Sequence, residues 1–223
     1  MSLSGLTTQH CAECNTYDSD SNHSSAPARL DVASQVILGA APAADGFVAA
    51  LDGSHPWGYE REDSATKRWK LDSVQAAGAD LMWRVTYQDM AAVWPTSTSE
   101  YAAPMNESPK VVFSTTLEDA GWAETRIASG DLREEIAAIK REEGNDVIAR
   151  GGATFAQALS RLGLVDEYRL NIQPAALGAG MPMFDRLPTP LHLELVEAHT
   201  YSTGAAIHLY RPRESAATET IEE

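Results

Sequence analysis

The sequence predicts an α/β fold with a mostly parallel central sheet, an antiparallel C-terminal hairpin and helices on both faces. In the first two-thirds of the chain, short apolar runs alternate with segments of helical spacing, an order typical of parallel sheets layered by helices. The last third instead has consecutive strand-like runs, and the final two are joined at Ser202, Thr203 and Gly204, as in a hairpin. A chain of 223 residues can bury one sizeable core.

We expect residues 32–212 to form this domain, after a flexible leader at 1–31 and before an acidic tail at 213–223. The leader is polar and has few apolar residues, a composition that does not form a core. Cys11 and Cys14 form a C-x-x-C motif, but further ligands at metal spacing and a strand-to-helix context are both missing. We therefore predict two reduced thiols there and no metal site.

The first elements follow from apolar spacing. A strand is expected at 35–40, and a turn with a second extended piece at 44–50. Trp69, Leu71 and Val74 have the spacing of an amphipathic helix that ends near Gly78. The next expected elements are a strand at 80–83, a helix at 85–94 stopped before Pro95, and a strand at 110–114.

The following segment, 131–144, has the signals of a capped helix. Asp131 is a suitable N-cap, Glu134 follows three residues later, and Gly144 comes after the helical spacing ends. The remaining expected elements are a strand at 145–149, a helix at 153–163, and strands at 165–177, 191–201 and 204–213.

Composition narrows the possible partners. The formal charge of −15 argues against nucleic acid or a membrane surface as a partner. No apolar run approaches the roughly 20 residues that cross a bilayer, and the N-terminus has no secretory signal pattern. We expect a cytoplasmic protein whose ligand, if anionic, binds at a local basic patch.

Three predicted turns carry residues suited to phosphate. Arg84 and Thr86 follow one strand, Ser114 ends the next, and the sequence Arg-Gly-Gly-Ala-Thr at 150–154 joins a strand to a helix. Ligands of open α/β sheets bind outside the carboxyl ends of the strands, and helix N-termini attract anions. Each feature alone has a simpler explanation: a tight turn at the glycines, a surface position for Arg84, a strand end at Ser114. Together they would meet at one rim.

These residues lie within a wider resemblance. The segments "DLMWRVTYQDMAAVWP", "PKVVFSTTLED", "NDVIARGGATFAQALSRLGLVDEYRLNIQPAALGAGMPMFDRL" and "LHLELVEAHTYSTGAAIHLYRP" are similar to the dihydrofolate reductase-like superfamily. Among its members, the chain most resembles relatives of the riboflavin-biosynthesis pyrimidine reductase domain. The likeness runs from about Val36 to Pro212, and the Gly-Gly segment with "LVDEYRL" is its most specific part. It implies a single dihydrofolate reductase-like domain.

The resemblance also implies an NADPH-dependent reductase and its site residues. By matching position, Gly151, Gly152, Ala153 and Thr154 would hold the cofactor pyrophosphate. Arg84 and Thr86 would bind phosphates, and Ser114 would lie near the adenosine phosphate. Asp45 matches an Asp-Gly turn beside the nicotinamide. The family also leads us to expect a homodimer.

The second catalytic candidate comes from the residues themselves. A carboxylate could protonate or orient a pterin- or pyrimidine-like ring, and Glu60, Glu62 and Asp63 precede the first long helix. Of these we select Asp63, which is equally suited to cap that helix. Trp57, Tyr59 and Trp69 could wall an aromatic ligand or belong to the core.

Two departures from the family pattern motivate an alternative. Trp83 stands where the family usually has glycine, and Ala44 replaces a serine or threonine before Asp-Gly. A non-catalytic NADP(H)-binding protein that has lost the reductase chemistry is therefore the second hypothesis. A Rossmann dehydrogenase is disfavoured, because an early Gly-x-Gly-x-x-Gly with its downstream acidic residue is missing.

Overall fold

The computed structural model describes residues 34–56, 63–142 and 144–213. The predictions for the leader at 1–31 with its two cysteines, for Glu60, Glu62, Trp57 and Tyr59, and for residues 214–223 of the tail lie outside this part. No helix within the described ranges is long and apolar enough to cross a membrane.

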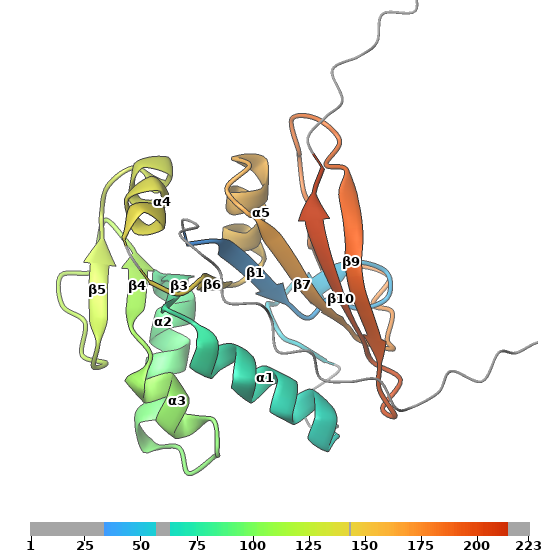
Figure 1. Ribbon diagram of the computed structural model, residues 1–223, viewed down its shortest axis with the longest axis horizontal. Coiled ribbons are helices and arrows are strands. Elements are labelled where there is room, and N and C mark those ends of the chain that lie inside the picture. Colours follow the sequence, from blue (N-terminus) through green and yellow to red (C-terminus); the bar gives the residue numbers. More distant parts are fainter. Residues whose placement is uncertain (1–33, 57–62, 143, 214–223) are drawn as a thin grey trace, which may run out of the picture. The chain divides into compact units, whose positions relative to one another are not determined.

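An eight-stranded sheet forms the centre of the domain (Figure 1). Its strand order is β5-β4-β3-β6-β1-β7-β10-β9. The strands are β1 (Val36–Ala40), β3 (Ala79–Trp83), β4 (Lys110–Phe113), β5 (Thr125–Ala128), β6 (Val147–Arg150), β7 (Glu167–Ile172), β9 (Leu193–Thr200) and β10 (Ala206–Pro212). All neighbours from β5 to β7 pair in parallel, whereas β10 pairs antiparallel with both β7 and β9. The predicted parallel sheet with an antiparallel hairpin at its edge is confirmed.

Helices cover both faces of the sheet, as predicted. Successive residues of β3 point to opposite faces of the sheet and belong to two different hydrophobic clusters. Leu81 packs in a large cluster with α4 and α5, whereas Met82 packs in a smaller one with α1, α2 and α3. The helices are α1 (Ser64–Ala76), α2 (Arg84–Ala91), the 3₁₀ helix η1 (Trp94–Thr96), α3 (Ala102–Glu107), α4 (Leu132–Arg141) and α5 (Ala153–Arg161). We call the sheet surface that carries Met82 the α1 face and the opposite surface the α5 face.

Local sequence signals set several element ends. Asp131 caps α4, where its carboxylate accepts hydrogen bonds from the backbone N–H groups of Arg133 and Glu134 at 2.9 and 3.3 Å. At the hairpin between β9 and β10, Gly204 has a φ of +84°, which glycine adopts without strain. Both features agree with the sequence predictions.

The sequence patterns missed four short elements. Strand β5 alternates in burial and carries the exposed Arg126, so its apolar signal is too short to detect. Helix α3 contains Pro104 in its first turn, and η1 includes Pro95, at which the preceding helix was expected to stop. Strand β8 (Met181–Pro182) pairs with β2 (Phe47–Ala49) in a separate two-stranded sheet. These elements exist because tertiary contacts complete them.

Candidate functional site

Two helix N-termini meet at the carboxyl edge of the sheet. Strands β3 and β6 are neighbours, and each leads directly into a helix, α2 after Trp83 and α5 after Gly152. Neither helix has a side-chain cap. The backbone N–H of Gly152 donates to Oγ1 of Thr86 at 3.2 Å, which joins the two first turns. Because N–H groups in a first helical turn have no intrahelical acceptor, this edge concentrates positive potential.

The two glycines before α5 serve different purposes. A Cβ on Gly151 would lie 2.5 Å from Cδ1 of Phe155, whose side chain is fully buried, so packing alone requires glycine there. A Cβ on Gly152 would meet nothing closer than Oγ1 of Thr86 at 4.0 Å. The tight-turn explanation therefore accounts for Gly151. The bare backbone of Gly152 fits the alternative, in which an anion approaches the turn.

Aromatic packing fixes the geometry of this edge. The ring of Phe155 lies 5.4 Å from that of Trp83 and 5.6 Å from that of Phe113, measured between centroids. Trp83 is the N-cap residue of α2 and has an extended backbone with φ of −82°. Any residue adopts this conformation, so the position does not demand the glycine that the family usually has there.

Arg84 and Ser114 lie at the same edge, because β4, β3 and β6 are consecutive in the sheet. Nη1 of Arg84 donates to Oε1 of Gln88 at 2.9 Å along the exposed side of α2. Oγ of Ser114 accepts from the backbone N–H groups of Thr116 and Leu117 at 3.2 and 2.9 Å. The structure thus brings the three predicted turns together on one rim, with the Ser114 oxygen already engaged in its own turn.

Asp45 holds two loops together. Its Oδ2 accepts from the backbone N–H groups of Leu177 and Gly178, both at 2.8 Å. The turn that contains it requires Gly46, which has a φ of +86°. The carboxylate therefore ties the turn after β1 to the loop after β7, and its catalytic assignment stays a prediction.

Asp63 caps α1, as the sequence alternative proposed. Its Oδ1 accepts from the backbone N–H and the hydroxyl of Thr66, and its Oδ2 accepts from the backbone N–H and the hydroxyl of Ser202. These hydrogen bonds, the backbone one from Thr66 above all, lower the pKa of Asp63 to about 2. A carboxylate that is ionised throughout the neutral range is a poor proton donor. The geometry favours capping over acid catalysis.

Arg150 points away from the glycine turn that it precedes. Its Nε donates to Oδ1 of Asp80 at 2.5 Å, and Asp80 is fully buried. Asp80 lies two residues before Met82 on β3, so the ion pair belongs to the α1 face. Sequence reasoning left open whether Arg150 reaches the cofactor or the surface. The structure places it in neither position.

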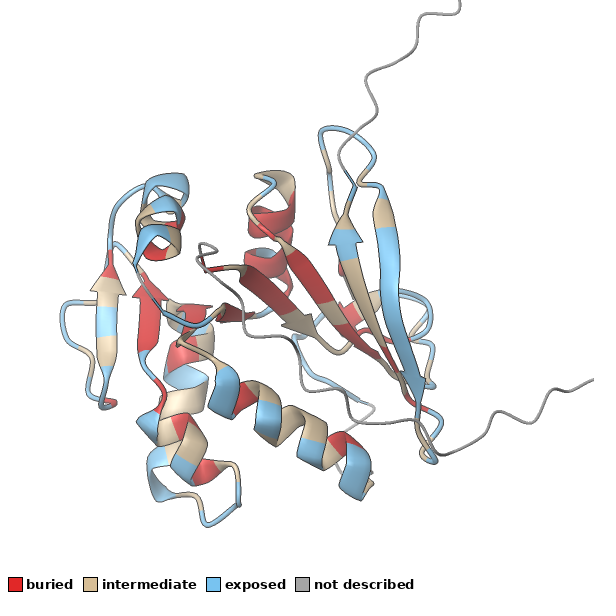
Figure 2. Ribbon diagram, in the orientation of Figure 1, coloured by how far each residue is buried: buried red, intermediate tan, exposed pale blue. Residues whose placement is uncertain are grey.

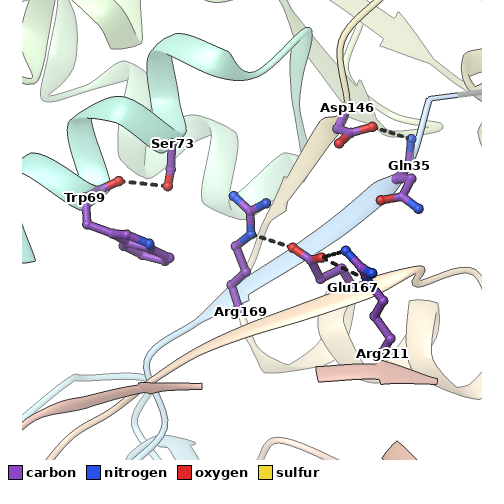
Figure 3. A network of polar contacts seen from close by, with 7 residues as sticks. All are labelled: Gln35, Trp69, Ser73, Asp146, Glu167, Arg169 and Arg211. Atoms are coloured by element: carbon purple, nitrogen blue, oxygen red, sulfur yellow. Dashed lines mark hydrogen bonds and ion pairs between the residues drawn. The ribbon is translucent and has the colours of Figure 1, made fainter. Parts of the chain in front are cut away.

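A second group of charges on the α1 face was missed (Figure 3). Oε1 of Glu167 accepts from Nε of Arg169 at 2.7 Å, and Oε2 accepts from Nη2 of Arg211 at 3.0 Å. The Glu167 side chain is only 4% exposed. The sequence signal that could have indicated this group was the segment "LVDEYRL". It was a specific part of the family resemblance, but no role was assigned to its Glu167 and Arg169.

An apolar cavity of about 360 Å³ lies behind the Asp45 turn. Leu170, Ile172 and Met183 line it and pack with the core of the α5 face, so it is separate from the charges of the α1 face. Across the described part of the chain, no three His, Cys, Asp or Glu side chains are grouped as a metal would require.

Comparison with known proteins agrees with this architecture. The family model of the RibD C-terminal domain matches residues 34–207. The uncharacterized protein YyaP of Bacillus subtilis (strain 168) is 26% identical over 185 residues, which cover 79% of this chain and 94% of that protein.

Two solved structures share the fold at low sequence identity. A pyrimidine reductase-like protein from Corynebacterium diphtheriae superposes with a TM-score of 0.59 at 14% identity, covering 81% of this chain and 92% of that one. Dihydrofolate reductase from Enterococcus faecalis, solved with NADP(H), gives a TM-score of 0.55 at 14% identity. The match covers 83% of this chain and 100% of the reductase chain.

Proposed function

The chain belongs to the RibD C-terminal domain family, and from that premise we propose that it is an NADPH-dependent oxidoreductase. Its substrate is a small pterin- or pyrimidine-like heteroaromatic compound. The observation that carries the proposal is the junction at Gly152 and Thr86, where two helices without side-chain caps begin side by side. Such paired N-termini suit a pyrophosphate, which bears negative charge and many acceptor oxygens.

The cofactor proposal assigns each rim residue a task. Gly151, Gly152, Ala153 and Thr154 hold the pyrophosphate through the first turn of α5, and Thr86 contacts it from α2. Arg84 lies on the exposed side of α2 and offers a guanidinium for the adenosine phosphate, with Ser114 beside it. A 2′-phosphate at this position would favour NADPH over NADH. Equal affinity for the two cofactors would contradict that assignment.

Bound NADPH supplies a hydride, and the residues of the chain bind and orient both reactants. Asp45 is proposed beside the nicotinamide, where it keeps the turn after β1 attached to the loop after β7. Asp63 remains the other candidate carboxylate, in an orienting rather than a proton-donating role, because its hydrogen bonds hold its pKa at about 2.

Fluorescence titration with NADPH tests the proposal directly. We expect saturable binding, a rise in melting temperature, and weaker binding of NADH. The variant Gly152→Glu places a carboxylate in the proposed cradle and should abolish binding by charge repulsion. Gly121→Glu adds the same charge at a glycine where a Cβ would have no atom within 4 Å, and serves as the control. No melting shift at millimolar NADPH would overturn the proposal.

A second candidate is a non-catalytic NADP(H)-binding protein. Ala44 carries no hydroxyl beside Asp45, and the ring of Trp83 packs at the start of α2. This candidate predicts cofactor binding without oxidation across a panel of dihydrofolate, pterins and aminopyrimidines. A single substrate that is turned over eliminates it.

We further propose that the protein is cytoplasmic and that it forms a homodimer through the edge strand β9. Leu195 and Val196 on this strand are 51% and 46% exposed, and an edge strand also offers unpaired backbone groups to a partner strand. Figure 2 shows β9 exposed along most of its length. Sedimentation of the wild type and of Val196→Lys would test the dimer. A monomeric wild type at micromolar concentration would contradict it.

A further inference from the structure

The loop that joins β4 to β5, residues 114–124, is anchored to α2 by two buried aromatic residues. Trp122 in the loop and Tyr87 on α2 are both 3% exposed. The backbone N–H of Trp122 donates to the hydroxyl of Tyr87 at 3.0 Å, and the two ring centroids are 6.0 Å apart. Nε1 of Trp122 also donates to Oδ1 of Asn106, on α3, at 2.7 Å. We call this pairing of loop and helix the Tyr87–Trp122 contact.

A buried lysine holds the same end of the loop from the side of the sheet. Nζ of Lys110 donates to the carbonyl oxygens of Asn106, Ser108 and Ala123 at 3.1, 2.6 and 3.2 Å. It also lies 4.4 Å from the ring centroid of Trp122, within the range of a cation–π interaction. An ammonium group has three N–H donors, and three acceptors surround this one. Lys110 therefore fixes the backbone beside Trp122 against the end of α3.

The last residue of the loop, Glu124, has an unusual backbone conformation. Its φ of +56° lies in the left-handed region, which residues with a Cβ disfavour. Its carbonyl oxygen accepts from the backbone N–H of Lys110 at 2.8 Å. Such conformations persist only where surrounding contacts fix them, and they are concentrated at functional sites. The strain at Glu124 is evidence that the anchor of this loop does more than connect two strands.

The anchored helix and loop both start at the rim where the adenosine phosphate is proposed. Trp83 and Phe113 are paired in the sheet, and Arg84 and Ser114 are the next residues of the two strands. Neighbouring strands are about 5 Å apart, so the helix and the loop begin side by side. Tyr87 is only the fourth residue of α2, in the same first turn as Arg84. The Tyr87–Trp122 contact therefore fixes the angle between the helix that carries Arg84 and the loop that carries Ser114.

Packing along the loop connects this contact with the Ser114 hydroxyl. Leu117 and Ala120 pack against the hydrophobic cluster that contains Tyr87 and Trp122. The backbone N–H of Leu117 donates to Oγ of Ser114 at 2.9 Å. A hydroxyl that accepts in this way still has its own O–H to donate to a phosphate oxygen. The orientation of that donor depends on a residue which itself rests on the buried cluster.

We infer that the Tyr87–Trp122 contact sets the separation of Arg84 and Ser114, and thereby determines how strongly the protein selects an adenosine ligand that carries a 2′-phosphate. Tyr87 and Trp122 are buried positioning residues, which act on the ligand through the arginine and the serine. The inference rests on the proposed function, which it deepens by naming the residues that control cofactor selectivity at the same site.

Two ligands that differ only in the 2′-phosphate test the inference. Adenosine 2′,5′-bisphosphate is compared with adenosine 5′-monophosphate by isothermal titration calorimetry. We expect the wild type to bind the bisphosphate about tenfold or more tightly, the range of a charge-assisted hydrogen bond. The ratio of the two dissociation constants is the readout, because a general loss of structure would weaken both ligands and leave the ratio unchanged.

Two variants loosen the anchor from different sides. Tyr87→Phe keeps the ring and removes the hydroxyl that accepts from the backbone of Trp122, and Trp122→Phe removes the indole N–H that donates to Asn106. Each should lower the preference for the bisphosphate to about threefold or less, with affinity for the monophosphate within about twofold of the wild type. Tyr168→Phe is the matched control. It removes another buried hydroxyl, which donates to Oγ of Ser160 at 3.1 Å on the α5 face, and should keep the preference.

A double-mutant cycle tests whether Tyr87 acts through Arg84. Arg84→Gln removes the guanidinium and should itself lower the preference for the bisphosphate. In the Arg84→Gln background, Tyr87→Phe should have little further effect, because the group that it positions is already gone. A full additional loss in the double variant would overturn the inference.

The outcomes for the inference and for the proposed function are distinct. A wild type without preference for the bisphosphate overturns the inference, whether or not NADPH binds. So does a Tyr87→Phe or Trp122→Phe variant, folded by circular dichroism, that keeps the full preference, and so does an equal loss in Tyr168→Phe. NADPH binding is measured on the same samples. A wild type that selects the bisphosphate through Tyr87 but does not bind NADPH counts against the proposed function alone.

Discussion

Helices α5 and α1 lie on opposite faces of one sheet and are held in opposite ways. Seven of the nine residues of α5 are buried, so packing fixes the position of its first turn. Only Thr66 and Val74 are buried among the thirteen residues of α1, which Asp63 instead anchors through hydrogen bonds. Figure 2 shows the contrast in burial. The rim therefore offers rigid backbone to a ligand, whereas the α1 face offers charged side chains.

The buried ion pair of the α1 face gives the strongest test of this contrast. Arg150→Met removes the partner of the fully buried Asp80 and should lower the free energy of unfolding by about 3–5 kcal/mol. NADPH affinity of the folded fraction should stay unchanged, because Arg150 points away from the rim. Urea unfolding measures the loss. Arg126→Met removes exposed ion pairs on β5 and should cost less than about 1 kcal/mol. Similar losses in the two variants would contradict the argument.

Packing at the rim predicts a somewhat smaller effect. Gly151→Ala forces a methyl group against Phe155, which cannot move freely in the core, and should destabilise the protein by about 1–3 kcal/mol. Thermal unfolding gives the change. Gly121→Ala, at a glycine without close neighbours, is the control and should have little effect. If Gly151→Ala is as stable as the control, the turn is less constrained than the distances indicate.

The contact between α2 and α5 should matter for binding more than for stability. Thr86→Val removes the hydroxyl that accepts from Gly152, and we expect the Kd for NADPH to rise about fivefold, equivalent to about 1 kcal/mol. Isothermal titration calorimetry measures the change. Thr125→Val, on the edge strand β5, is the control. A Kd equal to that of the wild type would show that the two helix ends remain joined without this hydroxyl.

The smallest expected effect concerns pH and the anchor of α1. Because the folded-state pKa of Asp63 is about 2 and its ordinary pKa is 3.8, its contribution to stability is present above pH 3.8. That contribution is lost as the pH falls toward 2. Asp63→Asn should therefore lose less stability than the wild type between pH 6 and pH 2.5, measured by urea unfolding. Asp72→Asn, on the exposed side of the same helix, should behave like the wild type. Parallel pH profiles for wild type and Asp63→Asn would refute this role.

Local sequence determined much of the fold. The alternation of strands and helices, the cap at Asp131 and the turn at Gly204 depend on residues near one another in the chain, and each was predicted correctly. Strand β5 and helix α3 were not, because a four-residue edge strand and a helix with an early proline give weak local signals. Their stability comes from neighbours that are distant in sequence.

The same division holds for the candidate site. The alternation of strands and helices predicted that Arg84, Ser114 and Gly152 lie at one edge of a parallel sheet, and the strand order β4-β3-β6 then makes them neighbours. Sequence could not show that Arg150 turns back to Asp80, or that Asp63 is committed to capping. These outcomes depend on which partner each charged group finds across the sheet.

By itself the sequence determined the order of elements and the place of the glycine turn, since backbone preferences and apolar spacing act over short distances. Only the tertiary structure decided that packing against Phe155 excludes a side chain at Gly151, while the backbone of Gly152 stays bare. It also decided that the nearly buried Glu167 accepts hydrogen bonds from both Arg169 and Arg211. The physical reason is strand register, which pairs residues far apart in the chain and sets the face on which each side chain lies.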